Sequence, residues 1–343
     1  DHGFDIFSAA FYLLCRYEEY LPHEKDEYGR YAHINSLAFR EGFLYQPLIN
    51  IWIDHFKKKL KEKFPQYQIP NSQFRFLPTY DIDEAFAYKH KSFFRNIGGI
   101  IRSVFLAQYE MIDERIKILK GKQKDIYDSY DELDKLHTDY HLKPIYFFHV
   151  GEKNGRYDKN IPPVKKAMQD IITRHADKYE IGIHPSWQSG DEPEKLRTEI
   201  LHLGHISGKQ ITSSRQHYIR FTLPGTFRQL IEAGIKNDYS MGYGSINGFR
   251  ASVASSFYWF DLEKNQPTDL LLHPFCYMDA NSFFEEKKSP QQAYDEMMHY
   301  YREVKSVNGT LITIWHNTFI GTAKRFEGWR EAYQKFIAAV TAS

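Results

Sequence analysis

Short apolar and aromatic runs alternate with helical patterns from residue 74 onward. Seven runs have the length and composition of buried strands. They are FRFLPTYD (74–81), PIYFFHV (144–150), KYEIGIH (178–184), QHYIRF (216–221), GIKNDYS (234–240), DLLLHPF (269–275) and TLITIWH (310–316). Helical stretches such as VKKAMQDIITRHA and PEKLRTEILHLGHI lie between them. Strands that alternate with helices predict βαβ units and a parallel sheet. Seven strands favour a distorted (β/α) barrel, with an open doubly wound sheet as the competing architecture.

The first 70 residues follow a different pattern. Amphipathic helices are expected over residues 5–20 and 46–64, with a polar, glycine-containing stretch between them. No strand pattern alternates with these helices. We therefore predict an α/β protein of two parts, an N-terminal helical extension over residues 1–70 and a barrel over residues 71–343.

Ionisable residues fall at the ends of several predicted strands. Asp81 and Asp83 follow the first strand, His184 ends the third, His217 lies on the fourth and His316 ends the seventh. In parallel α/β folds the functional site lies at the carboxyl ends of the strands. The sequence therefore predicts that these five side chains converge on one rim of the barrel.

The two carboxylates and the first histidine suit a metal site. Residues two apart on a strand point to the same face, so Asp81 and Asp83 can enter one site, one as cation ligand and the other as base. The alternative for this pair is a turn or helix cap. His184, followed by Pro185, offers an imidazole of the kind that binds zinc and similar metals. Its alternative role is a hydrogen bond to a loop carbonyl.

The fourth and seventh strands supply further candidates. Arg215 and His217 are two residues apart, so Arg215 could orient the Asp81 carboxylate through a bidentate contact while His217 completes the metal set. A histidine that ends the last strand, His316, could be a general acid near neutral pH. Asp279 could hold that imidazole in one tautomer.

Composition limits the classes of partner. The net charge of +1 gives no overall field for nucleic acid or membranes, and no apolar run reaches 18 residues. We therefore expect no nucleic-acid partner and no membrane insertion. Two distant cysteines and no recognisable signal peptide lead us to expect a cytoplasmic protein. Residues 89–124 carry nine Lys or Arg against three Asp or Glu. This segment could receive an anionic partner, although a solvated helical crossover is the favoured interpretation.

Five motifs in chain order resemble a known family. They are TYDID (79–83), GIHPS (182–186), SRQHY (214–218), GFR (248–250) and WHN (315–317). As a set they resemble the polysaccharide deacetylase family, also called the NodB-homology or carbohydrate esterase 4 family, and most closely a divergent bacterial branch. The resemblance implies a distorted (β/α)7 barrel of the NodB-homology type.

The resemblance also implies roles for the motif residues. Asp81 matches the family's catalytic base, and Asp83 and His184 match metal ligands. The family often has a second histidine four residues after the first, where this chain has Gln188. We expect His217 to take the place of that ligand, because it lies on the next strand of the same rim.

The remaining motifs complete the expected activity. His316 matches the general acid, and Arg215 matches the arginine that orients the base, with Arg250 as the rival. The implied cofactor is a divalent metal, zinc, and the implied reaction removes acetyl groups from N- or O-acetylated sugars. The sequence leaves two alternatives open: hydrolysis of a non-sugar amide or ester, and a catalytically inactive carbohydrate-binding relative, which Gln188 keeps in play.

Overall fold

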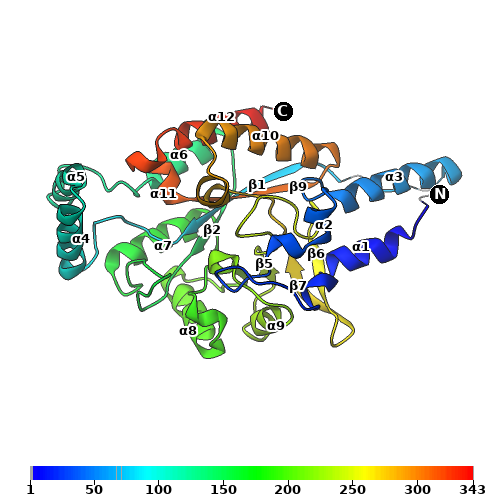
Figure 1. The fold of residues 1–343 in the computed structure, drawn as a ribbon, viewed down its shortest axis with the longest axis horizontal. Coiled ribbons are helices and arrows are strands. Elements are labelled where there is room, and N and C mark those ends of the chain that lie inside the picture. Colours follow the sequence, from blue (N-terminus) through cyan, green and yellow to red (C-terminus); the bar gives the residue numbers. More distant parts are fainter. Residues whose placement is uncertain (1–2, 67, 71, 343) are drawn as a thin grey trace.

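The computed structural model describes residues 3–66, 68–70 and 72–342. A nine-stranded sheet forms its centre, in the order β6-β7-β5-β4-β3-β2-β1-β9-β8 (Figure 1). All neighbouring strands are parallel except β6 and β7, which are antiparallel. The strands are β1 (Arg75–Ile82), β2 (Ile145–Phe148), β3 (Glu180–Ile183), β4 (Ser213–Ser214), β5 (Asn237–Asp238), β6 (Phe257–Asp261), β7 (Gln266–Leu272), β8 (Tyr277–Met278) and β9 (Thr310–His316).

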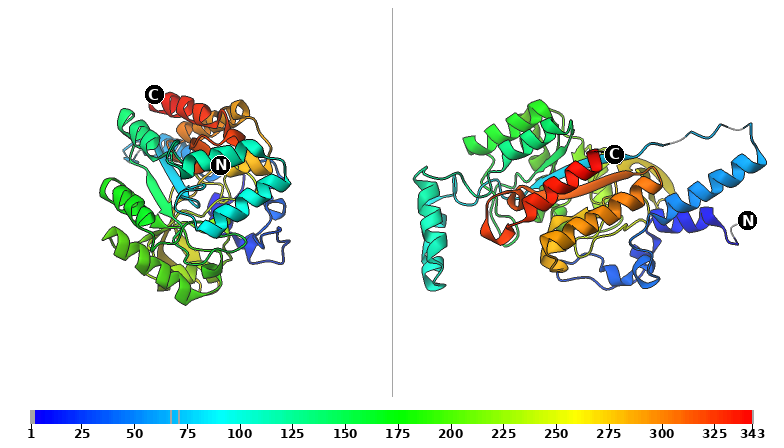
Figure 2. Two further views of the ribbon diagram at one scale, coloured as in Figure 1. Left: turned by 90° about the vertical axis from the view of Figure 1, so that its left-hand side faces the viewer. Right: turned by 90° about the horizontal axis from the view of Figure 1, so that it is seen from above.

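Helices lie on both sides of the sheet, as expected for parallel strands joined by helical crossovers (Figures 1 and 2). The α-helices are α1 (Ile6–Leu14), α2 (Leu37–Arg40), α3 (Leu48–Lys63), α4 (Phe93–Phe105), α5 (Tyr109–Leu119), α6 (Tyr130–Asp139), α7 (Lys166–Lys178), α8 (Pro193–Ser207), α9 (Gly225–Glu232), α10 (Pro290–Ser306), α11 (Asn317–Ile320) and α12 (Trp329–Thr341). None of the helices in the described part of the chain has the length and apolar composition needed to cross a bilayer.

The central strands are buried almost throughout. All four residues of β2 are buried, as are five of the seven residues of β9. Strands covered on both faces require near-continuous apolar sequence, which IYFF and LITIW supply. The ring of Tyr80 in β1 stacks on that of Tyr146 in β2, with the centroids 4.8 Å apart. The Tyr80 hydroxyl forms hydrogen bonds with the hydroxyl of Tyr333 at 2.6 Å and with the imidazole of His137 at 2.8 Å. This packing fixes β1, which carries the first two candidate site residues.

Most of the predicted strands are found within a few residues of their expected places, and one prediction was wrong. Residues 216–221 do not form a strand, because β4 ends at Ser214 and His217–Ile219 form a 3₁₀ turn. Tyr218 in that turn has φ 59°, a left-handed conformation that no strand permits. The short strands β6 and β8 were not expected. The described strands at the two edges of the sheet, β6 and β8, do not pair with each other.

One of the two predicted N-terminal helices is shorter than expected. The predicted helix over 46–64 is present as α3, but the one over 5–20 ends at Leu14. Asp5 caps α1 by accepting hydrogen bonds from the amides of Phe7 and Ser8, at 2.9 and 3.1 Å. Arg16 then adopts φ 56°, which turns the chain toward the barrel.

A cluster of buried charges, which we call the anchor cluster (Arg16, Glu18, Glu19 and Arg250), joins the N-terminal segment to the barrel. Arg250 donates to both carboxylate oxygens of Glu19, at 2.9 and 2.6 Å, and Arg16 donates to Glu18 and Glu19, each at 2.7 Å. Arg16 also donates to the carbonyl of Arg250. Burial alone raises the pKa of Glu19, but the guanidinium groups of Arg250 and Arg16 lower it to about 2. The N-terminal segment is therefore held by fully paired charges.

Candidate metal and catalytic site

The carboxyl ends of the parallel strands meet at one rim, as the topology requires. Asp81 is the penultimate residue of β1, and Asp83 follows the strand. His184 comes directly after β3, and His316 is the last residue of β9. His217 lies three residues beyond β4, in the 3₁₀ turn. The structure thus brings all five together around a cavity of about 380 Å³ that each of them lines.

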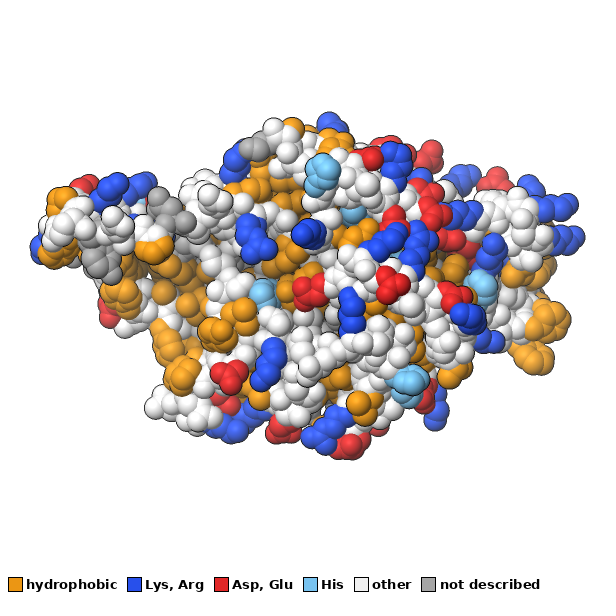
Figure 3. Space-filling model, turned by 180° about the vertical axis from the view of Figure 1, so that it is seen from behind, with side chains coloured by type: hydrophobic (Ala, Val, Ile, Leu, Met, Phe, Trp, Pro, Cys, Tyr) orange, Lys and Arg blue, Asp and Glu red, His pale blue; other side chains and the backbone are white. Residues whose placement is uncertain are grey.

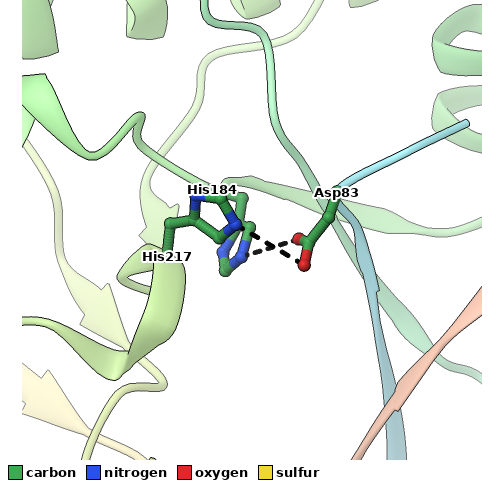
Figure 4. Close-up of side chains that lie close together, drawn as sticks. All are labelled: Asp83, His184 and His217. Carbon is green, nitrogen blue, oxygen red and sulfur yellow. Dashed lines mark ion pairs between the residues drawn. The ribbon is translucent and has the colours of Figure 1, made fainter. Parts of the chain in front are cut away.

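Asp83 is the centre of this arrangement (Figure 4). Its Oδ1 lies 3.0 Å from Nε2 of His184, and its Oδ2 lies 3.5 Å from Nε2 of both His217 and His316. One ligand atom from each of Asp83, His184 and His217 lies within 4.8 Å of the others. These three are the residues that the sequence analysis selected as metal ligands.

The hydrogen bonds behind the imidazoles fix which nitrogen faces Asp83. Nδ1 of His184 lies 2.7 Å from the carbonyl oxygen of Arg215, so it carries the proton and donates. Nδ1 of His217 donates to the Asp158 carboxylate at 3.1 Å. In the neutral tautomers that these bonds select, both Nε2 atoms present a lone pair to the carboxylate of Asp83.

These donors fit a divalent cation. Two imidazole lone pairs and a carboxylate aimed at one point repel each other unless a positive charge, a proton or a metal cation, lies between them. Asp83 Oδ1 is buried without a hydrogen-bond partner among the described residues. Burial alone would raise the pKa of Asp83, but the imidazoles of His217, His184 and His316 lower it well below its ordinary value. Burial lowers the pKa of His217, but Asp83 and then Asp158 raise it to about 9. The local field therefore favours positive charge at this point.

Arg215 contacts the other carboxylate, Asp81. Its Nη1 donates to Asp81 Oδ1 at 2.8 Å, and its Nε donates to the carbonyl of Tyr239. The guanidinium lies over the ring of Phe147, 4.3 Å from the centroid. Gly182 makes room for that ring, because a Cβ at residue 182 would lie 2.5 Å from it. The contact to Asp81 is single and not bidentate, and Asp81 Oδ2 is left facing His184 Nε2 at 3.8 Å.

The rival arginine lies elsewhere. Arg250 is engaged by Glu19 in the anchor cluster, and its Nη1 donates to the carbonyl of Gly242. Gln188 is also outside the site: it is exposed, and its side-chain oxygen accepts from Lys195 at 2.6 Å. The position where the family often has a second histidine therefore does not line the cavity in this chain.

His316 is carried by β9, which lies on the other side of β1 from β3 in the sheet. Its Nδ1 donates to Asp279 Oδ1 at 2.6 Å, and its backbone amide donates to Asp279 Oδ2 at 2.7 Å. Burial lowers the pKa of His316, but Asp279 and then Asp83 raise it to about 10. Nε2 is the nitrogen that faces Asp83 and the cavity. The pairing with Asp279 has the geometry that the sequence analysis expected.

Asp158 and His149 lie next to His217, and neither was predicted from the sequence as a site residue. Asp158 lies in the loop ten residues after β2, so no strand-end pattern points to it. His149 directly follows β2, and the rule that selected His184 would also have selected it. Its Nε2 lies 3.6 Å from Asp158, and burial lowers its pKa to about 4. His149, Asp158 and His217 form a second group of possible ligands. Because His217 turns Nδ1 toward Asp158 and Nε2 toward Asp83, Asp158 fits best as the carboxylate that orients His217.

The N-terminal segment forms part of the cavity wall, which the sequence analysis did not foresee. Tyr28 and Arg30 line the cavity beside Tyr218. The rings of Tyr28 and Tyr218 lie 5.2 Å apart, and Arg30 Nη1 donates to the carbonyl of Tyr218 at 2.7 Å. This bond supports the left-handed turn that carries His217. Trp187 and Tyr157, stacked at 3.9 Å, continue the aromatic surface next to Tyr28.

Comparisons with known proteins give one family model at the N-terminus and several solved structures of similar fold. A model of a family of unknown function (DUF7033) matches residues 1–65. A search of curated protein sequences gave no match. Among solved structures, a probable polysaccharide deacetylase from Pseudomonas aeruginosa PAO1 matches with a TM-score of 0.50 at 12% identity, over 79% of this chain and 86% of its own. PuuE allantoinase matches with a TM-score of 0.52 at 12% identity, over 80% and 89%.

This chain has the fold of the polysaccharide deacetylases. The match confirms the fold class that the sequence predicted, and the family resemblance holds at the level of the fold. Both structural matches cover about four-fifths of this chain. The candidate site lies at the rim where the carboxyl ends of β1, β3 and β9 meet.

Proposed function

We propose that the protein is a metal-dependent hydrolase that removes acetyl groups from N- or O-acetylated sugars. The observation that carries this proposal is the convergence of Asp83, His184 and His217 on one point, with an unpartnered carboxylate oxygen at its centre. The fold of the polysaccharide deacetylases supports the substrate class, and the aromatic wall of the cavity suits the apolar faces of sugar rings.

Asp83, His184 and His217 would hold the metal, and zinc would suit this set of one oxygen and two nitrogen donors. When bound there, a divalent cation supplies Lewis-acid activation of a water molecule and of the acyl carbonyl. Asp158 and the carbonyl of Arg215 keep the two imidazoles in the tautomers that leave Nε2 free.

Asp81 is the general base. Arg215 fixes its Oδ1, so Oδ2 remains free to accept the proton of the water that attacks the acyl carbon. His316 is the general acid. Asp279 holds its Nδ1, and its Nε2 faces the cavity, where it donates a proton to the departing amine or alkoxide as the bond to the acyl carbon breaks. The products are acetate and the deacetylated sugar.

A panel of acyl compounds tests this proposal. Zinc-loaded protein is incubated with N-acetylated sugar oligomers, O-acetylated sugars, an aryl acetate and cyclic amides, and acetate or amine release is measured. We expect release from the acetylated sugars, reduced about a thousandfold or more by Asp81→Asn. Asp177→Asn, an exposed carboxylate on α7, is the matched control and retains full activity.

The same panel separates the alternatives. Hydrolysis of the cyclic amides with no action on any acetylated sugar would replace the sugar substrate with a non-sugar amide. No turnover by the metal-loaded protein together with retained sugar binding would identify an inactive carbohydrate-binding relative.

A further inference from the structure

Helix α4 buries its polar side and exposes its apolar side. Asn96 and Ser103 are buried, whereas the large apolar residues of the helix face solvent. Phe94 and Phe105 are 84% and 85% exposed. At 3.6 residues per turn, the exposed apolar residues cover one side of the helix, roughly 120° of its circumference. They are Phe93, Phe94, Ile97, Ile101, Val104 and Phe105.

Specific polar contacts fix this orientation. The side-chain amide of Asn96 donates to the carbonyl of Tyr88 at 3.1 Å, and Arg115 of α5 donates to the carbonyl of Asn96 at 2.8 Å. The Arg115 guanidinium also lies 4.6 Å from the ring centroid of Tyr88. Gly99 faces Arg115, where any side chain would collide with the guanidinium. Helix α4 therefore packs against α5 through its polar and small residues, and its apolar side remains directed outward.

Helices α4 and α5 together, residues 93–119, project from the barrel as a helical arm (Figure 1, left; Figure 2, right). Figure 3 shows hydrophobic side chains beside Lys and Arg at this end of the molecule, on the right of the view. Six exposed apolar side chains on one side of a helix form a continuous surface that is unusual on a protein without a partner for it. The shape is a convex ridge, which suits insertion into a soft surface.

The charge of this region selects the kind of partner. Residues 89–124 carry an excess of six positive charges. The side chains of Arg102, Lys120 and Lys122 make no hydrogen bond or ion pair with any residue that the structure describes. Two copies of the arm would bring like charges together, so a second copy of this chain is disfavoured. An apolar ridge with basic flanks is complementary to an anionic lipid surface.

The arm is tied directly to the cavity rim. Lys91 pairs with Glu84, which lines the cavity, at 2.7 Å. Arg95 donates to the carbonyl of Lys159, another lining residue, at 2.8 Å. The chain enters α4 ten residues after Asp83. Figure 2, left, shows the molecule from the end that carries the arm, so the arm lies in front of the barrel in that view.

We propose that the helical arm docks the protein on an anionic lipid bilayer, with the apolar side of α4 inserted among the headgroups and the basic residues against lipid phosphates. Docking through the arm holds the cavity close to the bilayer. On the proposed hydrolase function, that position gives access to acetylated sugars anchored in the membrane.

Vesicle binding tests this proposal without reference to catalysis. The full chain is mixed with vesicles of phosphatidylcholine alone, or of equal parts phosphatidylcholine and phosphatidylglycerol, and the bound fraction is measured by flotation. We expect binding to the anionic vesicles that weakens as salt is added. Phe94→Ser with Phe105→Ser weakens binding about tenfold or more. Lys120→Gln with Lys122→Gln weakens it about fivefold for each charge removed.

The matched control is Leu201→Ser with Tyr258→Ser, which removes two exposed apolar side chains from α8 and β6 and leaves binding unchanged. Two results overturn the proposal. One is wild-type protein that does not bind the anionic vesicles. The other is equal binding by wild type and by the double phenylalanine variant. Light scattering tests for a different result: a wild-type dimer, a monomeric double phenylalanine variant, and no vesicle binding by either protein. That result would overturn the lipid proposal and assign the ridge to contact with a second copy of the chain. Loss of hydrolysis in the acyl panel leaves the vesicle result unaffected, so the two proposals fail separately.

Discussion

The anchor cluster and the site around Asp83 are built from similar charged side chains, but they differ in how completely these are paired. In the anchor cluster, Glu19 receives hydrogen bonds on both oxygens, and Arg250 donates from all three of its nitrogens. In the site, Oδ1 of Asp83 and Nη2 of Arg215 are buried without hydrogen-bond partners among the described residues.

This difference separates structural charge from functional charge. Buried polar groups in folded proteins are paired, because an unpaired one costs about 1–3 kcal/mol. The unpaired oxygen of Asp83 lies beside two imidazole nitrogens, and this set of ligand atoms fits a cation. The anchor cluster offers no open position, and it joins the N-terminal segment to the barrel.

The largest expected effect comes from breaking the site at its centre. Asp83→Asn removes the anionic ligand, so we expect loss of tight metal binding and a fall in hydrolysis of about a thousandfold or more. The free energy of unfolding of the metal-free protein should also fall, because His184, His217 and His316 lose the carboxylate whose charged form they stabilise. A variant that kept its metal and its activity would remove Asp83 from the ligand set. Elemental analysis and thermal melting measure the two quantities.

Breaking the anchor cluster should lower the stability of the protein and leave its metal binding unchanged. Glu19→Gln leaves two buried guanidinium groups short of a counter-charge, so we expect a loss of about 3 kcal/mol in the free energy of unfolding. Zinc affinity of the folded variant should be close to that of wild type. Urea unfolding with and without zinc separates these effects, and a variant as stable as wild type would contradict the structural role.

The same cluster predicts how stability depends on pH. The pKa of Glu19 is held at about 2, below its ordinary value of 4.5. A carboxylate with a lowered pKa in the folded state contributes stability that is fully present above its unfolded pKa and is lost as pH falls through the folded pKa. Wild-type protein should therefore lose this contribution progressively between about pH 5 and pH 2. Unfolding measured across that range should show a smaller pH dependence in Glu19→Gln.

A smaller effect is expected from the carboxylate behind His217. Asp158→Asn keeps a hydrogen-bond acceptor beside Nδ1 but removes the charge, so zinc affinity should fall about 10- to 100-fold while the fold is retained. Competition with a zinc chelator measures the change. The control is Asp191→Asn, an exposed residue that pairs with Arg220. Equal affinities in wild type and Asp158→Asn would mean that His217 is oriented by other contacts.

The smallest effect concerns the wall that the N-terminal segment provides. Tyr28→Ala removes one aromatic face of the cavity and touches none of the proposed ligands. We expect KM to rise about fivefold with kcat little changed, because the loss is one of substrate contact. A fall in kcat at constant KM would instead point to a displaced His217 turn. Steady-state kinetics on the best acetylated sugar distinguish the two.

The sequence predicted six of its seven strands within a few residues of their places, because buried parallel strands require continuous apolar runs such as IYFF. The sequence also led us to expect His217 close to His184, and the structure places the two imidazoles 4.9 Å apart. The segment that carries His217 is a turn and not the predicted strand. The alternation in QHYIRF resembles a strand, and only the tertiary bond from Arg30 to the carbonyl of Tyr218 shows why the turn is adopted there.

Other features depend on contacts between distant parts of the chain. Glu19 and Arg250 are 231 residues apart, so no local pattern could reveal that they pair. Asp158 and Tyr28 lie on loops and enter the site only through the folding of those loops. The sequence shows the excess of six positive charges in residues 89–124, but it does not show which side chains of this segment remain unpaired on the surface. The sequence favours a solvated helical crossover in this segment, and the structure adds that the exposed side of α4 is its apolar side.

Zinc titration by calorimetry tests the central claim most directly. It compares metal-stripped wild type, His217→Ala and, as a matched control, Gln188→Ala, whose side chain lies outside the cavity. We predict one tight site in wild type and Gln188→Ala, and its loss in His217→Ala. Wild-type protein that binds no zinc, or a His217→Ala variant that binds it as tightly as wild type, would contradict the account.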